Sequence, residues 1–141
     1  MSAPRPVVFD ASVAVAWYAP EEGSARAAPL QRGSVPLFAP TLVQIEVANA
    51  LMMRLRRRPP CPTGYPEAAL NELRSGTVTF VPDATLLDAA MALAGRLLHP
   101  IYDCLYLTLA RREEAMLATF DARLARHATA LAIPLWDPDP P

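Results

Sequence analysis

The feature that most constrains the fold of this 141-residue chain is the alternation of short apolar runs with longer helical patterns. The first run, Val7-Val8-Phe9, is β-branched and aromatic, which is typical of a buried strand. Strands that alternate with helices form a largely parallel sheet, because parallel neighbours need a crossover connection. We therefore predict an α/β fold with a central, mostly parallel sheet flanked by helices.

The residue patterns also predict approximate bounds for these elements. Strands are expected at residues 7–9, 35–39, 77–81 and 116–119. An edge strand is also expected at 134–136, at the start of the proline-rich end 134–141. Helices are expected at residues 11–18, 24–31, 41–56, 65–74, 83–98, 101–113 and 120–131, with Thr41 as the cap of the third. The proline-rich segment 59–64 is expected to be a loop. Residues 1–141 are accordingly predicted to form one domain.

Composition excludes several classes of enzyme. All 13 basic residues are arginine, so a P-loop and Schiff-base chemistry, which need lysine, are excluded. Cys61 and Cys104 form no C-x-x-C motif, and His99 and His127 have no neighbour at zinc-ligand spacing, so neither a disulfide nor a zinc framework is expected. The sequence has no apolar signal segment and no run long enough to span a bilayer. A soluble, cytoplasmic protein is the expectation.

Two acidic residues lie where predicted strands end. Asp10 follows the first strand and precedes Ser12, while Asp121 lies two residues after Thr119, at the end of the strand 116–119. Ligands of such folds bind at the carboxyl ends of the strands, so we expect both carboxylates at one edge of the sheet. Each acid also has an ordinary explanation as the N-cap of the following helix.

Two further acidic residues lie on predicted helices that are otherwise apolar. Glu46 and Asn49 share a helix face with core-type residues, and a buried carboxylate requires a partner or a metal ion. Asp103 lies in the first turn of its helix, where the helix dipole alone favours an acid. A glutamate at the edge of a helix is the ordinary alternative for Glu46. Taken together, four such acids in one α/β chain indicate a site.

These segments resemble the PIN domain family, and within it the VapC-like ribonuclease toxins of bacterial toxin–antitoxin pairs. The resemblance covers nearly the whole chain and rests on Val7-Val8-Phe9-Asp10-Ala11-Ser12, Glu46-Val47-Ala48-Asn49-Ala50-Leu51, Tyr102-Asp103 with its apolar helix, and Thr119-Phe120-Asp121. It implies a PIN-like three-layer sandwich, a homodimer, and a small VapB-like antitoxin that covers the acidic groove. Ala122 and Arg123 follow Asp121, where many relatives carry a further acid. Fewer ligands are therefore expected on the side of the site that would hold a second metal ion.

The acids also indicate a mechanism. Clustered carboxylates repel one another unless a cation neutralises them, and oxygen ligands favour Mg²⁺ or Mn²⁺ over zinc. Such an ion supports hydrolysis of a phosphodiester without lysine or histidine, so we predict a metal-dependent ribonuclease. The expected catalytic residues and metal ligands, direct or through water, are Asp10, Glu46, Asp103 and Asp121, with Ser12, Asn49 and Thr119 in support.

Phosphate contacts are expected from an arginine cluster in an otherwise near-neutral chain of net charge −1. The cluster consists of Arg54, Arg56, Arg57 and Arg58. Arginines at a helix C-terminus also stabilise the helix dipole, which is the ordinary alternative. Two other functions remain open. One is a non-catalytic PIN-like module that binds RNA or protein, and the other is a phosphatase of the haloacid-dehalogenase type, which needs a second aspartate where Ser12 stands.

Overall fold

Four parallel strands form the sheet of this protein in a computed structural model that describes residues 3–19, 23–57 and 64–139. The strands are β1 (Val7–Phe9), β2 (Leu37–Pro40), β3 (Thr79–Val81) and β4 (Met116–Ala118), in the order β3-β2-β1-β4. In register, Val7 lies opposite Leu37 of β2 on one side and opposite Met116 of β4 on the other. The predicted parallel sheet is confirmed.

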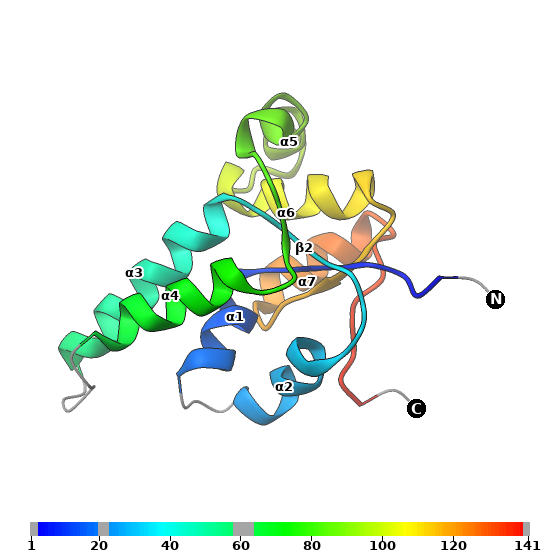
Figure 1. Cartoon of the computed structure of the whole chain (residues 1–141). Coiled ribbons are helices and arrows are strands. Elements are labelled where there is room, and N and C mark those ends of the chain that lie inside the picture. Colours follow the sequence, from blue (N-terminus) through cyan, green and yellow to red (C-terminus); the bar gives the residue numbers. More distant parts are fainter. Residues whose placement is uncertain (1–2, 20–22, 58–63, 140–141) are drawn as a thin grey trace.

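Seven helices in the described ranges surround the sheet. They are α1 (Ala11–Tyr18), α2 (Ser24–Arg32), α3 (Leu42–Arg57), α4 (Tyr65–Ser75), α5 (Asp83–Leu97), α6 (Ile101–Arg112) and α7 (Ala122–Ala130). Figure 1 shows α5 and α6 above the sheet, α1 and α2 below it, and α3 beside α4. The three-layer arrangement expected from the family resemblance is therefore confirmed.

The core lies between the sheet and the helices on both of its faces. Every residue of β1 is buried, as is the α6 segment 104–110. A parallel sheet needs cover on both faces, which explains why β1, β2 and β4 are apolar throughout instead of alternating with polar residues. No helix formed by the described residues is long and apolar enough to cross a membrane.

Most element bounds agree with the patterns to within one or two residues, and the differences have local causes. Residues 134–136 form only a single bridge to β4, through Leu135 and Leu117, instead of an edge strand. Thr41 directly precedes α3 and is bonded to Asp83. The carboxylate of Asp83 accepts the Leu42 N–H at 3.0 Å, and the Thr41 hydroxyl accepts the Asp83 N–H at 3.2 Å. Residues 59–63 of the expected loop, including Cys61, lie outside the described residues.

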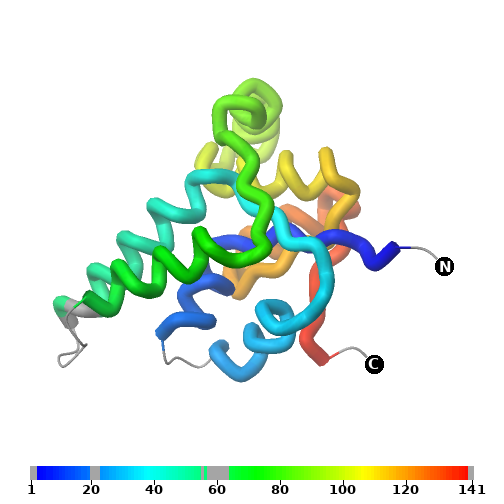
Figure 2. The backbone as a smooth tube through the Cα atoms, viewed as in Figure 1, coloured from blue at the N-terminus to red at the C-terminus, as the bar shows by residue number. Residues whose placement is uncertain are grey.

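The order in which strands are added to the sheet reverses at β1. From β1 it proceeds to β2 and β3 on one side, and it then returns to place β4 on the other side. Figure 2 shows the orange trace of β4 and the turn after it running beside the blue trace of β1. In open parallel sheets, the carboxyl ends of the strands at such a switch point are the usual ligand site.

Candidate active site

Asp10 is held at the switch point by β4 and the residue after it on one side, and by the first turn of α1. Its N–H donates to the Ala118 carbonyl of β4 at 3.2 Å, and its side chain caps α1 by accepting the Val13 N–H. The Ser12 hydroxyl donates to Oδ1 at 2.5 Å, and the Thr119 hydroxyl donates to Oδ2. The helix-cap and the functional interpretations of Asp10 are therefore compatible, because each uses part of the same carboxylate.

Burial changes the acidity of Asp10. The residue is only 6% exposed. This burial raises the pKa of its carboxyl from 3.8 to about 6, although the bonds from Ser12, Thr119 and Val13 act in the opposite direction. The nearby charge of Glu46 raises the pKa further. The side chain is thus a buried, hydrogen-bonded carboxylate with a like charge nearby, a situation that a bound cation relieves.

Glu46 of α3 is close enough to Asp10 for its charge to act on that carboxyl, and it is itself influenced by the charge of Asp103. Burial is the main cause that raises its pKa, and the charges of Asp103 and Asp83 add to the effect. The buried Tyr106 hydroxyl of α6 donates to Oε1 of Glu46, and the pKa of Tyr106 is raised by burial and by the charges of Glu46, Asp10 and Asp103. Glu46 therefore interacts electrostatically with two other carboxylates, that of Asp10 at the end of β1 and that of Asp103 in α6. We call Asp10, Glu46 and Asp103 the acidic cluster.

Asp103 has a partner that the sequence analysis did not assign. Nε2 of His99 lies 2.7 Å from Oδ2 of Asp103, and the ring N–H is the donor because a carboxylate has none. The His99 side chain is 4% exposed, and its ring packs on that of His127 with the centroids 4.4 Å apart. His99 thus fixes the orientation of one carboxylate of the acidic cluster.

Asp121 is oriented differently from the other three predicted acids. Its Oδ1 accepts the Arg123 and Leu124 N–H groups at 2.9 and 3.3 Å, so the carboxylate is the N-cap of α7, and the residue is exposed. Its own N–H donates to the Thr119 hydroxyl that holds Asp10. Asp121 is therefore connected to the acidic cluster through Thr119, while its carboxylate has the capping role.

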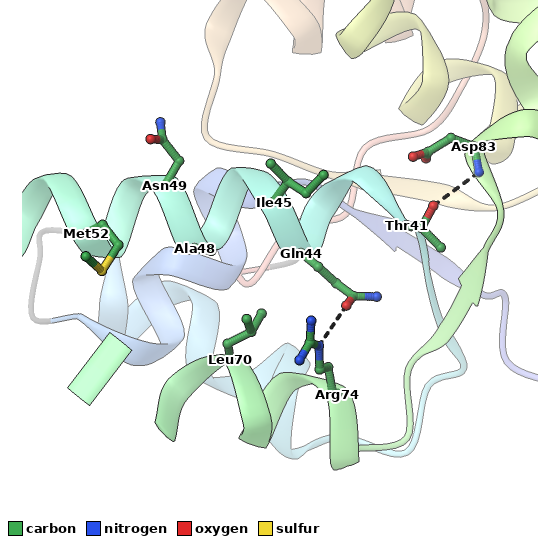
Figure 3. A pocket seen from close by; sticks show the side chains of 9 residues that line it. All are labelled: Thr41, Gln44, Ile45, Ala48, Asn49, Met52, Leu70, Arg74 and Asp83. Atoms are coloured by element: carbon green, nitrogen blue, oxygen red, sulfur yellow. Dashed lines mark hydrogen bonds between the residues drawn. The ribbon is translucent and has the colours of Figure 1, made fainter. Parts of the chain in front are cut away.

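Asn49 lies three residues after Glu46 on the same helix, α3. The residue is exposed and lines a cavity of about 530 Å³ between α3 and α4, together with Ile45 and Met52. Figure 3 shows this cavity and the hydrogen bond between Arg74 and Gln44 that crosses it.

The predicted arginine cluster lies at the other end of α3. Arg54 is eight residues beyond Glu46, which corresponds to about 12 Å along a helix axis. Arg56 is exposed, Arg57 is the last residue of the helix, and Arg58 lies outside the described residues. Arg54 and Arg56 therefore lie eight and ten residues beyond Glu46 along α3.

The donor chemistry of the acidic cluster fits a hard divalent cation. All three side chains offer oxygen ligands, and the raised pKa values of Asp10 and Glu46 express repulsion and desolvation that a cation offsets. Across the three described ranges, no three His, Cys, Asp or Glu side chains are already arranged to hold an ion.

Sequence reasoning missed His99, Tyr106 and Asp83 as neighbours of the acids. A weak signal existed for two of them, because His99 and Tyr106 lie four residues before and three residues after Asp103, which are contact spacings on a helix. No local signal connects Tyr106 with Glu46, which is 60 residues away. Only the packing of α6 against the sheet brings that pair together.

Comparisons with known proteins agree with the fold. The model of the PIN domain family matches residues 7–130. Ribonuclease VapC3 of Mycobacterium tuberculosis (strain CDC 1551 / Oshkosh) is 34% identical over 125 residues, which is 89% of this chain and 89% of that protein. M. tuberculosis VapC20, described as a toxin that cleaves the sarcin–ricin loop, aligns with a TM-score of 0.71 at 17% identity and covers 86% and 94% of the two chains. A toxin–antitoxin complex from Klebsiella pneumoniae aligns with a TM-score of 0.58 at 14% identity, covering 86% and 88%.

Proposed function

The chain belongs to the PIN domain family, and on this premise we propose that it is an endoribonuclease that acts as the toxin of a VapBC-type toxin–antitoxin pair. The observation that supports the proposal is the acidic cluster, in which the charge of Glu46 acts on Asp10 and that of Asp103 acts on Glu46, in a chain that is 34% identical to a ribonuclease. We propose that residues 1–141 act as one nuclease domain.

The cofactor of this activity is proposed to be Mg²⁺ or Mn²⁺. Asp10, Glu46 and Asp103 would hold the ion, with Asp121 in contact through water. A divalent cation supplies charge that stabilises the transition state of phosphodiester hydrolysis and makes water a better nucleophile. The chain's own part is to position the ligands: Ser12 and Thr119 orient Asp10, and Tyr106 orients Glu46.

The protonation state of Asp10 supports this role near neutral pH. With a pKa of about 6, the carboxyl is mostly ionised at pH 7 and above, and it is mostly protonated at pH 5. A protonated acid is a poor metal ligand, so RNA cleavage is expected to weaken as the pH falls through 6.

The proposed partners are RNA, a VapB-like antitoxin and a second copy of the chain. The similarity to VapC3 and to a toxin–antitoxin complex supports the first two, and the resemblance to VapC-like toxins supports the homodimer. Co-purification with the product of a neighbouring short reading frame tests the antitoxin, and sedimentation of the purified chain tests the dimer.

The decisive experiment is cleavage of a labelled single-stranded RNA by the purified chain, with Mg²⁺, Mn²⁺ or EDTA. We expect cleavage with either metal ion, none in EDTA, and a loss of at least about 100-fold in Asp10→Asn and in Asp103→Asn, because removal of one ligand charge impairs an electrostatic site. Asp88→Asn is the matched control, because Asp88 is an exposed acid of α5 outside the acidic cluster.

Two results would contradict the proposal. Wild-type rates in both ligand variants would remove the acidic cluster from the mechanism. RNA binding without any cleavage, with Mg²⁺ as well as with Mn²⁺, would favour the non-catalytic module instead.

A further inference from the structure

A second cavity opens directly beside the acidic cluster. It measures about 780 Å³, within the range of pockets that bind small ligands, and it lies between α1, α2, α3 and the turn before α7. Ser12 lines it, and the hydroxyl of Ser12 donates to Asp10. A group seated in this cavity therefore touches the residue that holds the buried carboxylate.

The wall of the cavity has the chemistry of a nucleotide site. Phe120 and Arg26 both line it, and the guanidinium carbon of Arg26 lies 5.9 Å from the centroid of the Phe120 ring. Arg26 is the one charged residue among the described residues that line the cavity. An aromatic ring beside a guanidinium is a pairing that accepts a base by stacking and a phosphate by charge.

Arg26 is available to a ligand. Its only ion pair in the described chain is with Asp139, at 3.9 Å, and both side chains are largely exposed, at 57% and 82%. Ion pairs of this kind contribute little in water, so a phosphate competes readily for the guanidinium. Arg26 can thus supply positive charge in the cavity beside the acidic cluster.

The Phe120 ring is fixed in place from two sides. The backbone N–H of Phe120 donates to the Ser12 hydroxyl at 2.9 Å, which connects it to Asp10. On the other side, the ring packs against Gly23, where an added Cβ would lie 2.8 Å from a ring carbon. The absence of a side chain at Gly23 therefore makes room for the ring, and the surface that Phe120 offers is preorganised.

We infer that this cavity binds one nucleotide of the RNA substrate next to the cleaved bond, with the base against Phe120 and a backbone phosphate on Arg26. The inference rests on the proposed ribonuclease function and adds a substrate subsite to it. Phe120 would stack on the face of a base, and Arg26 would bind a phosphate. The subsite therefore favours single-stranded RNA, in which bases are free to leave the stack.

The test compares variants of Phe120 and Arg26 in cleavage and in binding. Phe120→Leu is expected to raise KM about 10-fold with a smaller change in kcat, and Phe120→Tyr, which keeps the ring, is expected to restore the wild-type KM. Arg26→Gln is expected to weaken binding of a labelled single-stranded RNA in EDTA. It should also reduce the slope of log K against log salt by about 0.7, the value for one phosphate on a single strand.

Arg32→Gln is the matched control, because Arg32 is an exposed arginine of the same helix that does not line the cavity. Wild-type KM in Phe120→Leu together with a wild-type salt slope in Arg26→Gln would overturn the inference, while cleavage by the wild type would leave the proposed function standing. If the wild type cleaves no RNA, the proposed function fails, and the salt slope in EDTA still decides whether the cavity binds RNA. If Phe120→Leu does not fold, the surface variant Arg26→Gln decides alone.

Discussion

At the scale of single residues, the acidic cluster reduces the stability of the protein that contains it. Asp10 has a folded-state pKa of about 6 against an ordinary value of 3.8, so between these pH values the folded protein binds more protons than the unfolded chain. Stability contributed by this group is therefore present at low pH and is lost as the pH rises from about 4 to 6. The difference corresponds to about 3 kcal/mol, which is a large part of the stability of a small domain.

Asp10→Asn should consequently stabilise the metal-free protein while it abolishes cleavage. In EDTA at pH 7.5, we expect the free energy of unfolding in urea to rise by about 1–3 kcal/mol, because a buried charge is replaced by a neutral amide of the same shape. At pH 4.5, where the wild-type carboxyl is mostly protonated, the gain should shrink. An Asn variant that is less stable than the wild type at pH 7.5 would show that the three hydrogen bonds to Asp10 outweigh the cost of burying its charge.

His99 is expected to act as a positioning residue for Asp103. His99→Phe keeps a ring against His127 but removes the bond to Asp103, and we expect the Mg²⁺ concentration for half-maximal cleavage to rise about 10-fold, as is typical for partners of metal ligands. His99→Gln retains a donor and should restore part of the affinity. Equal metal dependence in the Phe variant and the wild type would assign His99 to packing alone.

At the scale of elements, the four acids are positioned by different devices. Asp10 lies at the end of a strand and caps α1, Glu46 projects from α3, and Asp103 lies in the first turn of α6. Asp121 caps α7, and its carboxylate serves that helix. The carboxylate of Asp83 likewise accepts the N–H of Leu42 at the start of α3, so α3 and its Glu46 are placed partly by a residue of α5.

Asp121→Ser separates the two roles of this acid. Serine is a good N-cap, so the variant should keep the unfolding free energy within a few tenths of a kcal/mol, whereas Asp121→Ala should lose about 1 kcal/mol. If the carboxylate also contacts the metal through water, the Ser variant cleaves RNA more slowly although it is as stable as the wild type. Full activity in Asp121→Ser would restrict Asp121 to capping.

At the scale of the whole molecule, a cation that binds only the folded state must stabilise the protein. At 100 times its Kd, such an ion contributes about 2.7 kcal/mol, which for a chain of this size raises the Tm by several degrees. We expect Mg²⁺ or Mn²⁺ to raise the Tm of the wild type relative to EDTA, and we expect a clearly smaller rise in Asp10→Asn. The same rise in both proteins would place the bound ion elsewhere.

What the sequence determined by itself is the order and type of the elements and the placement of Asp10 at the end of the first strand. These features follow from local patterns, because an apolar β-branched run, a proline or a helical periodicity acts on its own few residues. The parallel sheet also follows, because strands separated by helices leave few other topologies. The family resemblance added the expected set of acids, and the packed chain brings three of them together.

Only the tertiary structure decided the contacts across the sheet. Thr119 reaches Asp10 from 109 residues away, and Tyr106 reaches Glu46 from 60 residues away. No local pattern distinguishes an aspartate that turns toward such partners from one that turns toward its own helix, which is why Asp10 and Asp121 are equivalent in the sequence and different in the fold. The distinction arises from burial, since Asp10 is only 6% exposed and is bonded by Thr119 from across the sheet, while Asp121 lies at the surface.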